Sequence, residues 1–216
     1  MAIAEKLKIE NLALSFNERK VFDNISAMIE PGEKIQVTGA SGSGKSSLLK
    51  CLLGFNTAQG SIFYGNERLT SSSVWKIRTM IAYVPQEPLF QHSTVEEQLK
   101  SPFSFKANSH LKYNETEIDN LLAEFLLPLS IKKANTDQLS GGEKQRIAII
   151  SALSLKRKYI FFDEPTSALD PACKKVFWDI VARIKDTTCL IISHDSDVAI
   201  SFDGLISVAN ISGEVI

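Results

Sequence analysis

A short glycine-rich run has the residue types and the spacing that phosphate binding requires. Residues 39–46 match the pattern G-x-x-x-x-G-K-[ST]. Glycines let the backbone curl so that successive N–H groups point at one anion, because a Cβ would obstruct the curl. Lys45 supplies a positive charge for the β and γ phosphates, and the Ser46 hydroxyl is a hard oxygen ligand suited to Mg²⁺. The run predicts a phosphate-binding loop made of Gly39, Ala40, Ser41, Gly42, Ser43, Gly44, Lys45 and Ser46.

The sequence on either side of this loop supports the same interpretation. Ile35 and Val37 have the alternate spacing of a strand directly before it. Apolar residues follow it at helical spacing, and Gly54 is placed to end that helix. Because a loop between a strand and a helix N-terminus directs its N–H groups at one phosphate, we expect the chain to bind a nucleoside triphosphate.

Other polar side chains follow strand-like segments farther along the chain. Asp163 and Glu164 come directly after the apolar residues 159–162, and ligands of parallel α/β sheets bind at the carboxyl ends of the strands. We expect Asp163 to hold Mg²⁺, directly or through its waters, and Glu164 to orient and deprotonate an attacking water. Adjacent acids that merely cap the next turn are the alternative. Gln86 follows residues 79–84, and its side-chain oxygen could reach the metal.

A second glycine-rich turn precedes another predicted helix. Ser140, Gly141 and Gly142 offer a hydroxyl and exposed N–H groups at the start of that helix, which makes a second candidate anion site. The alternative is an ordinary N-cap after a flexible turn. His194 ends the predicted strand 189–193; at such a position a histidine is more often structural than catalytic.

The composition limits the functional classes. A chain of 216 residues and 23.9 kDa forms one large domain, or two intimate ones, with ample core. A net charge of -1 gives no field that would attract nucleic acid. The three cysteines are scattered in apolar segments, which favours buried thiols in a reducing compartment. Because there is neither a membrane-span-length apolar run nor a signal-peptide core, we expect a cytosolic protein.

The hydrophobic pattern predicts an α/β fold. Residues 95–155 carry helix signals and no convincing strand, including a helix opened by Asn114 with Glu117 and ended by Pro128. A further helix is predicted to begin at Asp170 as its N-cap. The first third mixes antiparallel strands with the strand that carries the loop. The strand-like segments are residues 7–16 with a break near Asn11, 21–29, 34–38, 61–64, 79–84, 159–162, 189–192 and 205–209.

Together these motifs resemble the nucleotide-binding subunit of ABC transporters, over essentially the whole chain. They come in the order that this family shows: the phosphate loop at 39–46, a glutamine loop at Gln86, the signature at 139–145, Asp163-Glu164, the segment 167–170 and a switch histidine at His194. The resemblance implies one ABC ATPase domain with a P-loop NTPase (RecA-like), mostly parallel sheet, an antiparallel β subdomain and a helical insert. It places the nucleotide-binding core at 1–86 and 156–216 and the helical subdomain at 87–155.

The resemblance also implies how ATP and Mg²⁺ are bound. A head-to-tail homodimer would hold each ATP between the phosphate loop of one copy and residues 140–142 of the other. Phe16 lies where the family usually has a tyrosine that stacks on adenine, and phenylalanine keeps the π-face. Ser47 would contact the α phosphate, and Asp170 would help to join the two active sites. Glu143 stands where many members have glutamine.

The implied partner is a separately encoded integral membrane permease. Its cytoplasmic helices would dock beside Gln86 and the helical insert, placing the chain on the inner face of the cell membrane. Because Glu164 and His194 are both present, the subunit should hydrolyse ATP. The alternatives are a soluble ABC-type ATPase acting on a ribosome or DNA, and a regulatory subunit that binds ATP without turnover. Among compact subunits the chain is similar to the ATPase of the bacterial Fet-type iron-export system.

Overall fold

Two β-sheets organise the chain, of which the computed structural model describes residues 5–17, 19–193 and 200–209. The first sheet is antiparallel, in the order β2-β1-β4-β5, and the second is parallel, in the order β6-β7-β8-β3-β9. The predicted mixture of an antiparallel and a parallel sheet is therefore confirmed. The strands are β1 Leu7–Phe16, β2 Arg19–Ile29, β3 Lys34–Thr38, β4 Gln59–Tyr64, β5 Glu67–Arg68, β6 Ile81–Val84, β7 Tyr159–Asp163, β8 Thr188–Ile192 and β9 Gly204–Ser207.

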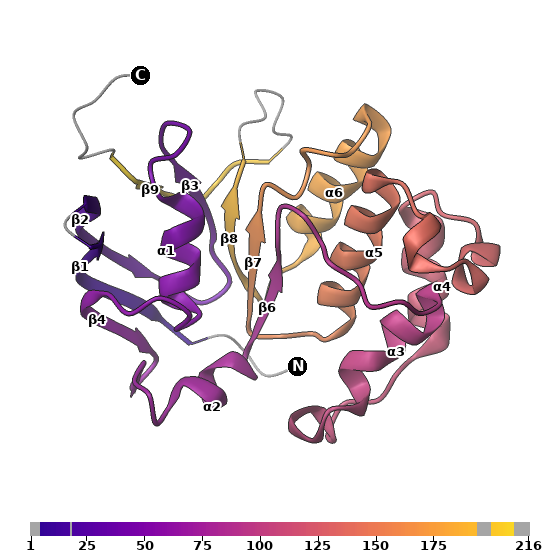
Figure 1. Ribbon diagram of the computed structural model, residues 1–216, viewed down its shortest axis with the longest axis horizontal. Coiled ribbons are helices and arrows are strands. Elements are labelled where there is room, and N and C mark those ends of the chain that lie inside the picture. Colours follow the sequence, from indigo (N-terminus) through magenta and orange to yellow (C-terminus); the bar gives the residue numbers. More distant parts are fainter. Residues whose placement is uncertain (1–4, 18, 194–199, 210–216) are drawn as a thin grey trace.

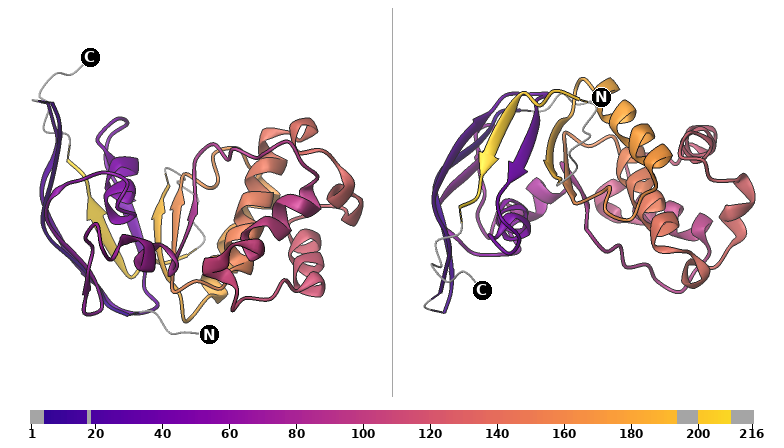
Figure 2. Two further views of the ribbon diagram at one scale, coloured as in Figure 1. Left: turned by 60° about the horizontal axis from the view of Figure 1, so that its bottom comes forward. Right: turned by 90° about the horizontal axis from the view of Figure 1, so that it is seen from above.

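The helices flank the parallel sheet on both sides. Helix α1 lies between the two sheets, whereas α5 and α6 cover the other face of the parallel sheet (Figures 1 and 2). Between β6 and β7 the chain is helical, as the predicted insert requires; the boundaries of that subdomain at 87 and 155 stay a prediction. The α-helices are α1 Lys45–Leu52, α2 Val74–Arg78, α3 Val95–Ser104, α4 Glu115–Glu124, α5 Gly141–Ser154 and α6 Pro171–Arg183, and short 3-10 helices span Lys106–Asn108, Leu129–Lys133 and Thr136–Gln138.

The parallel sheet separates two hydrophobic cores. Along β7, Tyr159 and Phe161 face the core shared with α1 and the antiparallel sheet, whereas Ile160 and Phe162 face the core shared with the helices α3 to α6. This alternation follows from the two-residue period of a strand. All five residues of β7 and of β8 are buried, which matches the continuous apolar runs in the sequence. Packing on both faces of the sheet therefore holds in place the strand ends that carry the polar residues.

Two local features differ from the sequence-based predictions. Helix α4 starts at the predicted cap, where the Asn114 side chain accepts from the N–H of Glu117, but it ends at Glu124 and not at Pro128. Leu126 has a left-handed φ of 57°, and the carbonyl of Phe125 accepts a hydrogen bond of 3.0 Å from Arg146. The N–H groups of Leu126 and Leu127 donate to the carbonyls of Ala123 and Leu122 at 3.0 and 2.8 Å, so the helix ends in a local Schellman turn, and the bond from Arg146 adds to it. The short helix α2 was not predicted; it is only five residues long and has no periodic pattern to detect.

Candidate functional site

The polar residues singled out in the sequence gather at one edge of the parallel sheet. The phosphate loop leaves the carboxyl end of β3, Gln86 follows the end of β6, and Glu164 follows the end of β7. Because β3, β6 and β7 belong to one parallel sheet, these three segments leave it at the same edge.

The glycines of the phosphate loop are required by backbone conformation and by space. Gly39, Gly42 and Gly44 have φ values of 151°, 73° and 101°, a region that other residues adopt at a cost. A Cβ on Gly39 would lie 2.3 Å from the carbonyl oxygen of Val208, and one on Gly44 would lie 2.4 Å from Cγ1 of Val21. The loop can therefore keep this shape only with glycine at these two crowded positions.

The loop presents donor groups for an anion. Lys45 is buried, with 6% of its surface exposed, and its Nζ donates to the carbonyls of Gly39 and Ala40 at 3.0 Å each. Neutral carbonyls are weaker acceptors for an ammonium than phosphate oxygens are. A bound phosphate can therefore replace the two carbonyls as the partner of Lys45. The Ser43 hydroxyl is buried and has no hydrogen-bond partner among the residues that the structure describes. A cradle of glycines with a lysine and an orphaned hydroxyl fits a triphosphate.

Three oxygen-bearing side chains meet where Mg²⁺ is expected. Asp163, which is only 3% exposed, accepts from the Ser46 hydroxyl on Oδ1 and from the Tyr83 hydroxyl on Oδ2, both at 2.9 Å. In the part of the chain that the structure describes, no cluster of three or more His, Cys, Asp or Glu could hold a metal alone. The donor set fits Mg²⁺, which is usually bound by one or two carboxylates together with substrate phosphates.

Tyr83 is a site residue that motif matching missed. It lies on β6, opposite Phe161 of β7, in an otherwise apolar strand. Burial, and then the negative charge of Asp163, raise the pKa of the Tyr83 hydroxyl well above its usual value, so it remains a donor at neutral pH. The signal that could have found it is a tyrosine in a buried strand, because the polar tip of such a residue needs a partner.

We expect Tyr83→Phe to raise the Mg²⁺ concentration needed for half-maximal ATP hydrolysis by about tenfold, because losing a hydrogen bond to a buried carboxylate costs roughly 1.5 kcal/mol. Magnesium titrations of the ATPase rate measure this. ATP binding without magnesium should stay unchanged. The matched control is Tyr113→Phe, since the Tyr113 hydroxyl is buried without a partner. An unchanged magnesium requirement in Tyr83→Phe would contradict the positioning role.

Gln86 and Glu164 contact each other directly. The Gln86 amide nitrogen donates to Oε2 of Glu164 at 2.9 Å, a contact that the sequence-based reasoning did not foresee. Glu164 has a left-handed φ of 49° and donates its N–H to the carbonyl of Ile192 at 3.0 Å, while its own carbonyl accepts from Ser167. Such a conformation persists only where its surroundings enforce it. His194 lies outside the described residues.

The remaining predicted ligands lie on the surface. Phe16, at the end of β1, is 51% exposed, and Ser47 lies on α1, half-buried. Ser140 caps α5: its hydroxyl accepts from the N–H of Glu143, and Gly141 and Gly142 form the first turn of the helix. Asp170 caps α6 by accepting from the N–H of Cys173 at 2.9 Å. The N-cap at Asp170 is as predicted, whereas the N-cap at Ser140 is the alternative interpretation, and its role as an anion site stays a prediction.

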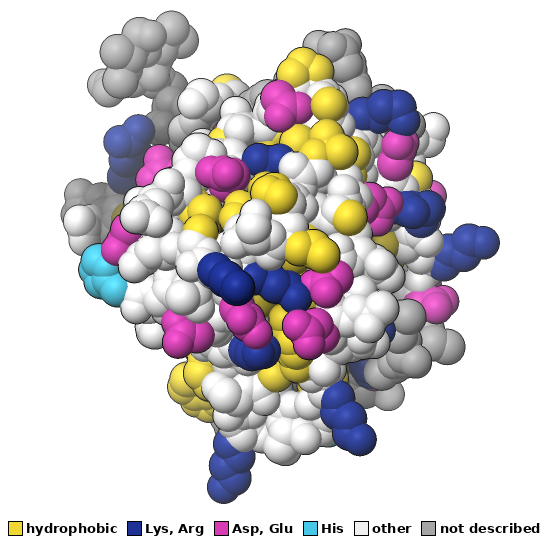
Figure 3. Space-filling model, turned by 90° about the vertical axis from the view of Figure 1, so that its right-hand side faces the viewer, with side chains coloured by type: hydrophobic (Ala, Val, Ile, Leu, Met, Phe, Trp, Pro, Cys, Tyr) yellow, Lys and Arg dark blue, Asp and Glu magenta, His cyan; other side chains and the backbone are white. Residues whose placement is uncertain are grey.

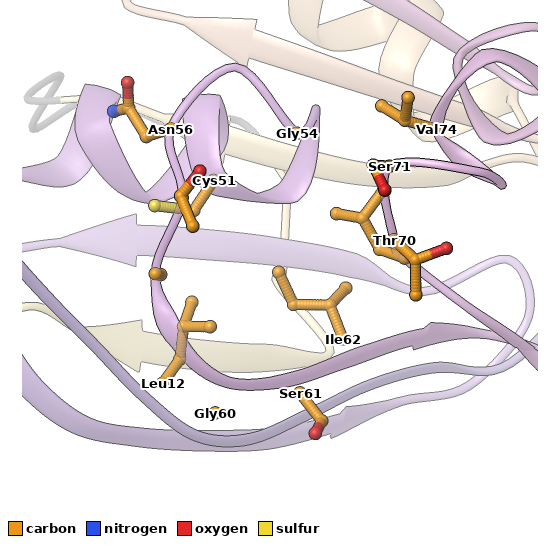
Figure 4. Close-up of a pocket in the computed structure, with 13 residues that line it drawn as sticks. Leu12, Cys51, Gly54, Asn56, Gly60, Ser61, Ile62, Thr70, Ser71 and Val74 are labelled. Carbon is orange, nitrogen blue, oxygen red and sulfur yellow. The ribbon is translucent and has the colours of Figure 1, made fainter.

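A pocket of about 510 Å³ lies at the other end of α1 (Figure 4). Cys51, Gly54, Ile62 and Val74 are among the residues that line it, and none of the predicted nucleotide-binding residues does. Burial raises the pKa of the Cys51 thiol to about 12, so the pocket offers no thiolate nucleophile. The predicted nucleotide site is instead an open surface, with Ala40, Ser41, Gly42, Gln86, Ser140, Gly141 and Asp170 all exposed.

Comparison with known proteins identifies the family to which the chain belongs. Residues 22–167, from β2 to beyond Glu164, match the family model described as ABC transporter. The chain belongs to the ABC transporter family. As in other ATP-binding subunits of this family, it binds ATP and is an ATPase. None of the described helices has the length and apolar character to cross a membrane.

Curated relatives of this ABC ATPase cover most of its length. It is 34% identical over 214 residues to the energy-coupling factor transporter ATP-binding protein EcfA1 of Leuconostoc mesenteroides, spanning 94% of this chain and 77% of that protein. It is 37% identical over 202 residues to the arginine transport ATP-binding protein ArtM of Bacillus subtilis, spanning 89% and 82%. The solved structure of a bacterial Atm1-family ABC exporter with ATP bound superposes with a TM-score of 0.83 at 20% identity, over 95% of this chain and 37% of that one, and shows the shared fold.

Proposed function

We propose that this subunit energises a membrane transporter by closing on ATP with a second copy of itself and opening after hydrolysis. The observation that supports it is that one chain carries two candidate anion sites, the phosphate loop and the Ser140 segment, each at the start of a helix. Helix α1, which follows the phosphate loop, packs in one hydrophobic core, and α5, which follows Ser140, packs in the other. The two sites thus begin helices on opposite faces of the parallel sheet. A second copy, turned head to tail, can bring its Ser140 segment to the phosphate loop of the first.

In this proposal each side chain of the site has one role. The loop and Lys45 bind the β and γ phosphates, and Ser47 and Phe16 contact the α phosphate and the adenine. Ser46, Asp163 and Gln86 hold Mg²⁺, which when bound neutralises charge on the β and γ phosphates. Tyr83 keeps Asp163 oriented.

Hydrolysis is assigned to the groups beside the γ phosphate. Glu164 orients the attacking water and takes a proton from it. His194 keeps its predicted catalytic role, and Ser140, Gly141 and Gly142 of the second copy bind the γ phosphate from the other side. Asp170 joins the two active sites across the dimer. Splitting of the phosphate removes the charge that held the copies together, and the dimer opens.

The proposed partner is an integral membrane permease, because EcfA1 and ArtM are ATP-binding proteins of transporters. Leu89 is 93% exposed, three residues after Gln86. A large apolar side chain held in water next to a site residue suits contact with a permease helix. In this proposal the subunit lies peripherally on the inner face of the cell membrane. The resemblance to the ATPase of the Fet-type iron-export system stays a prediction.

We expect Leu89→Asp to abolish transport by the reconstituted complex while the isolated subunit hydrolyses ATP at its normal rate. The reason is that a charge buried at an apolar contact without a partner costs more than the contact contributes. Substrate uptake or efflux in proteoliposomes and ATPase assays measure the two effects. Leu126→Asp is the control, since Leu126 is 58% exposed on the helical part of the chain. Equal transport by Leu89→Asp and the parent would contradict a permease contact at this residue.

The test of the function itself is recovery of the partner. Affinity-tagged subunit purified from detergent-solubilised membranes should retain an integral membrane protein, in stoichiometric amount. Recovery of ribosomes or DNA without such a protein would favour a soluble ATPase instead. Figure 3 gives that alternative no support, because the face of the helical region carries lysines, arginines and acids side by side, without a continuous basic surface.

A further inference from the structure

Glu143 contacts Ser140, the residue that binds the γ phosphate of the other copy in the proposed dimer. Its carboxylate oxygen Oε2 accepts from the Ser140 N–H at 2.9 Å and from the Ser140 hydroxyl at 2.7 Å. In return the Ser140 hydroxyl accepts from the Glu143 N–H at 3.3 Å. The side chain and the backbone of Ser140 are thus both engaged by one carboxylate.

This carboxylate is charged at neutral pH. The hydrogen bonds from the Ser140 side chain and backbone lower the pKa of Glu143. Arg146 of the same helix, whose charge also lowers the pKa of Glu143, directs its Nε to the carbonyl of Gly142 and its Nη1 to the carbonyl of Phe125. A full negative charge therefore sits at the N-terminus of α5, where the helix would otherwise offer partial positive charge to an anion.

We propose that Glu143 restrains the pairing of two copies, by holding the Ser140 hydroxyl and by repelling the γ phosphate that Ser140 must reach. The inference rests on the proposed sharing of ATP between two copies. When the phosphate approaches, the Ser140 hydroxyl has to turn its proton from the carboxylate to the phosphate, and the two negative charges come close together. The restraint sets a threshold: contacts elsewhere in the complex, such as those with the permease, decide when the dimer closes.

Glutamine at this position would keep the cap and remove the charge. Its side-chain oxygen can still accept from the Ser140 N–H, because both Glu and Gln complete a capping box. Glu143→Gln therefore isolates the charge without unfolding the first turn of α5. We expect the dissociation constant of the ATP-bound dimer to fall roughly tenfold, because each dimer contains two such sites and an exposed charge interaction changes affinity a few-fold.

The chain contains its own matched control. Glu97 forms the same capping box with Thr94 at the start of α3: its Oε2 accepts from the Thr94 N–H at 2.8 Å and from the Thr94 hydroxyl at 2.9 Å. This second cap precedes no glycine pair and lies outside the predicted nucleotide site. Glu97→Gln thus makes the same chemical change in the same kind of cap, and should leave pairing unchanged.

The experiment measures dimerisation by sedimentation velocity, with magnesium and ATP, in a Glu164→Gln background that arrests hydrolysis. Tighter dimers with Glu143→Gln, and unchanged ones with Glu97→Gln, support the restraint, provided that ATP binding to dilute monomer is the same in all three proteins. If the Glu143→Gln dimer has an equal or higher dissociation constant, Glu143 does not restrain pairing. If the Glu164→Gln protein alone forms no dimer with ATP, the shared site of the proposed function is wrong, and the restraint falls with it.

Discussion

Glu164→Gln is expected to lower the ATP turnover rate about a thousandfold, because a positioned general base contributes on that order. The same variant should accumulate as an ATP-bound dimer, since the step that opens the dimer is lost. The geometry of the site should survive the change. The Gln86 amide donates to Oε2 of Glu164, and an amide oxygen at that position can accept the same hydrogen bond. Phosphate release assays and size-exclusion chromatography with light scattering measure the two effects.

A matched glutamate outside the site controls for the loss of one negative charge. Glu67, on the antiparallel sheet, pairs with the exposed Lys76, and Glu67→Gln should turn over ATP at the parent rate. If Glu164→Gln hydrolyses ATP at the normal rate, another group is the base. If it neither hydrolyses ATP nor dimerises, the shared site of the proposed function is wrong. The regulatory alternative, a subunit that binds ATP without turnover, requires that the parent itself be inactive.

The sequence predicts those parts of the site that are local in the chain. The phosphate loop was predictable because its shape depends on glycines within one short run, and Gly39 and Gly44 leave no room for a Cβ. The N-caps at Asn114, Ser140 and Asp170 were predictable because a cap and its N–H donor are three residues apart. The strands β7 and β8 were predictable from continuous apolar runs.

Contacts between segments that lie far apart in the chain could not be predicted from the sequence. The bond of Tyr83 with Asp163 joins two neighbouring strands that lie 80 residues apart in sequence. The bond of Gln86 with Glu164 depends on how two loops leave the same sheet edge, which no spacing rule describes. The bond of Arg146 with the carbonyl of Phe125 joins α5 to the end of α4, 21 residues earlier in the sequence. Strand order and loop direction have to be known before such contacts can be predicted.

Lys45→Ala is expected to weaken ATP binding about a hundredfold, because a hydrogen bond from a charged donor to phosphate contributes up to roughly 3 kcal/mol. In the absence of ligand the ammonium donates only to the carbonyls of Gly39 and Ala40. The loss of these two hydrogen bonds should matter little for folding, since Ala40 is exposed and water can donate to the carbonyls in place of the ammonium. Isothermal titration calorimetry measures the affinity, and thermal unfolding without nucleotide should give the parent midpoint to within a few degrees.

Lys50→Ala controls for the loss of one positive charge from the same helix, because Lys50 is exposed on the last turn of α1. That variant should bind ATP like the parent, since Lys50 lies more than one helical turn beyond Lys45 and the loop. A Lys45→Ala protein that keeps parent affinity would show that the loop N–H groups and the helix N-terminus bind the triphosphate unaided. A protein that loses affinity and also unfolds would show instead that the bonds to Gly39 and Ala40 hold the loop together. Only a folded protein with weakened binding supports Lys45 as the phosphate-binding cation.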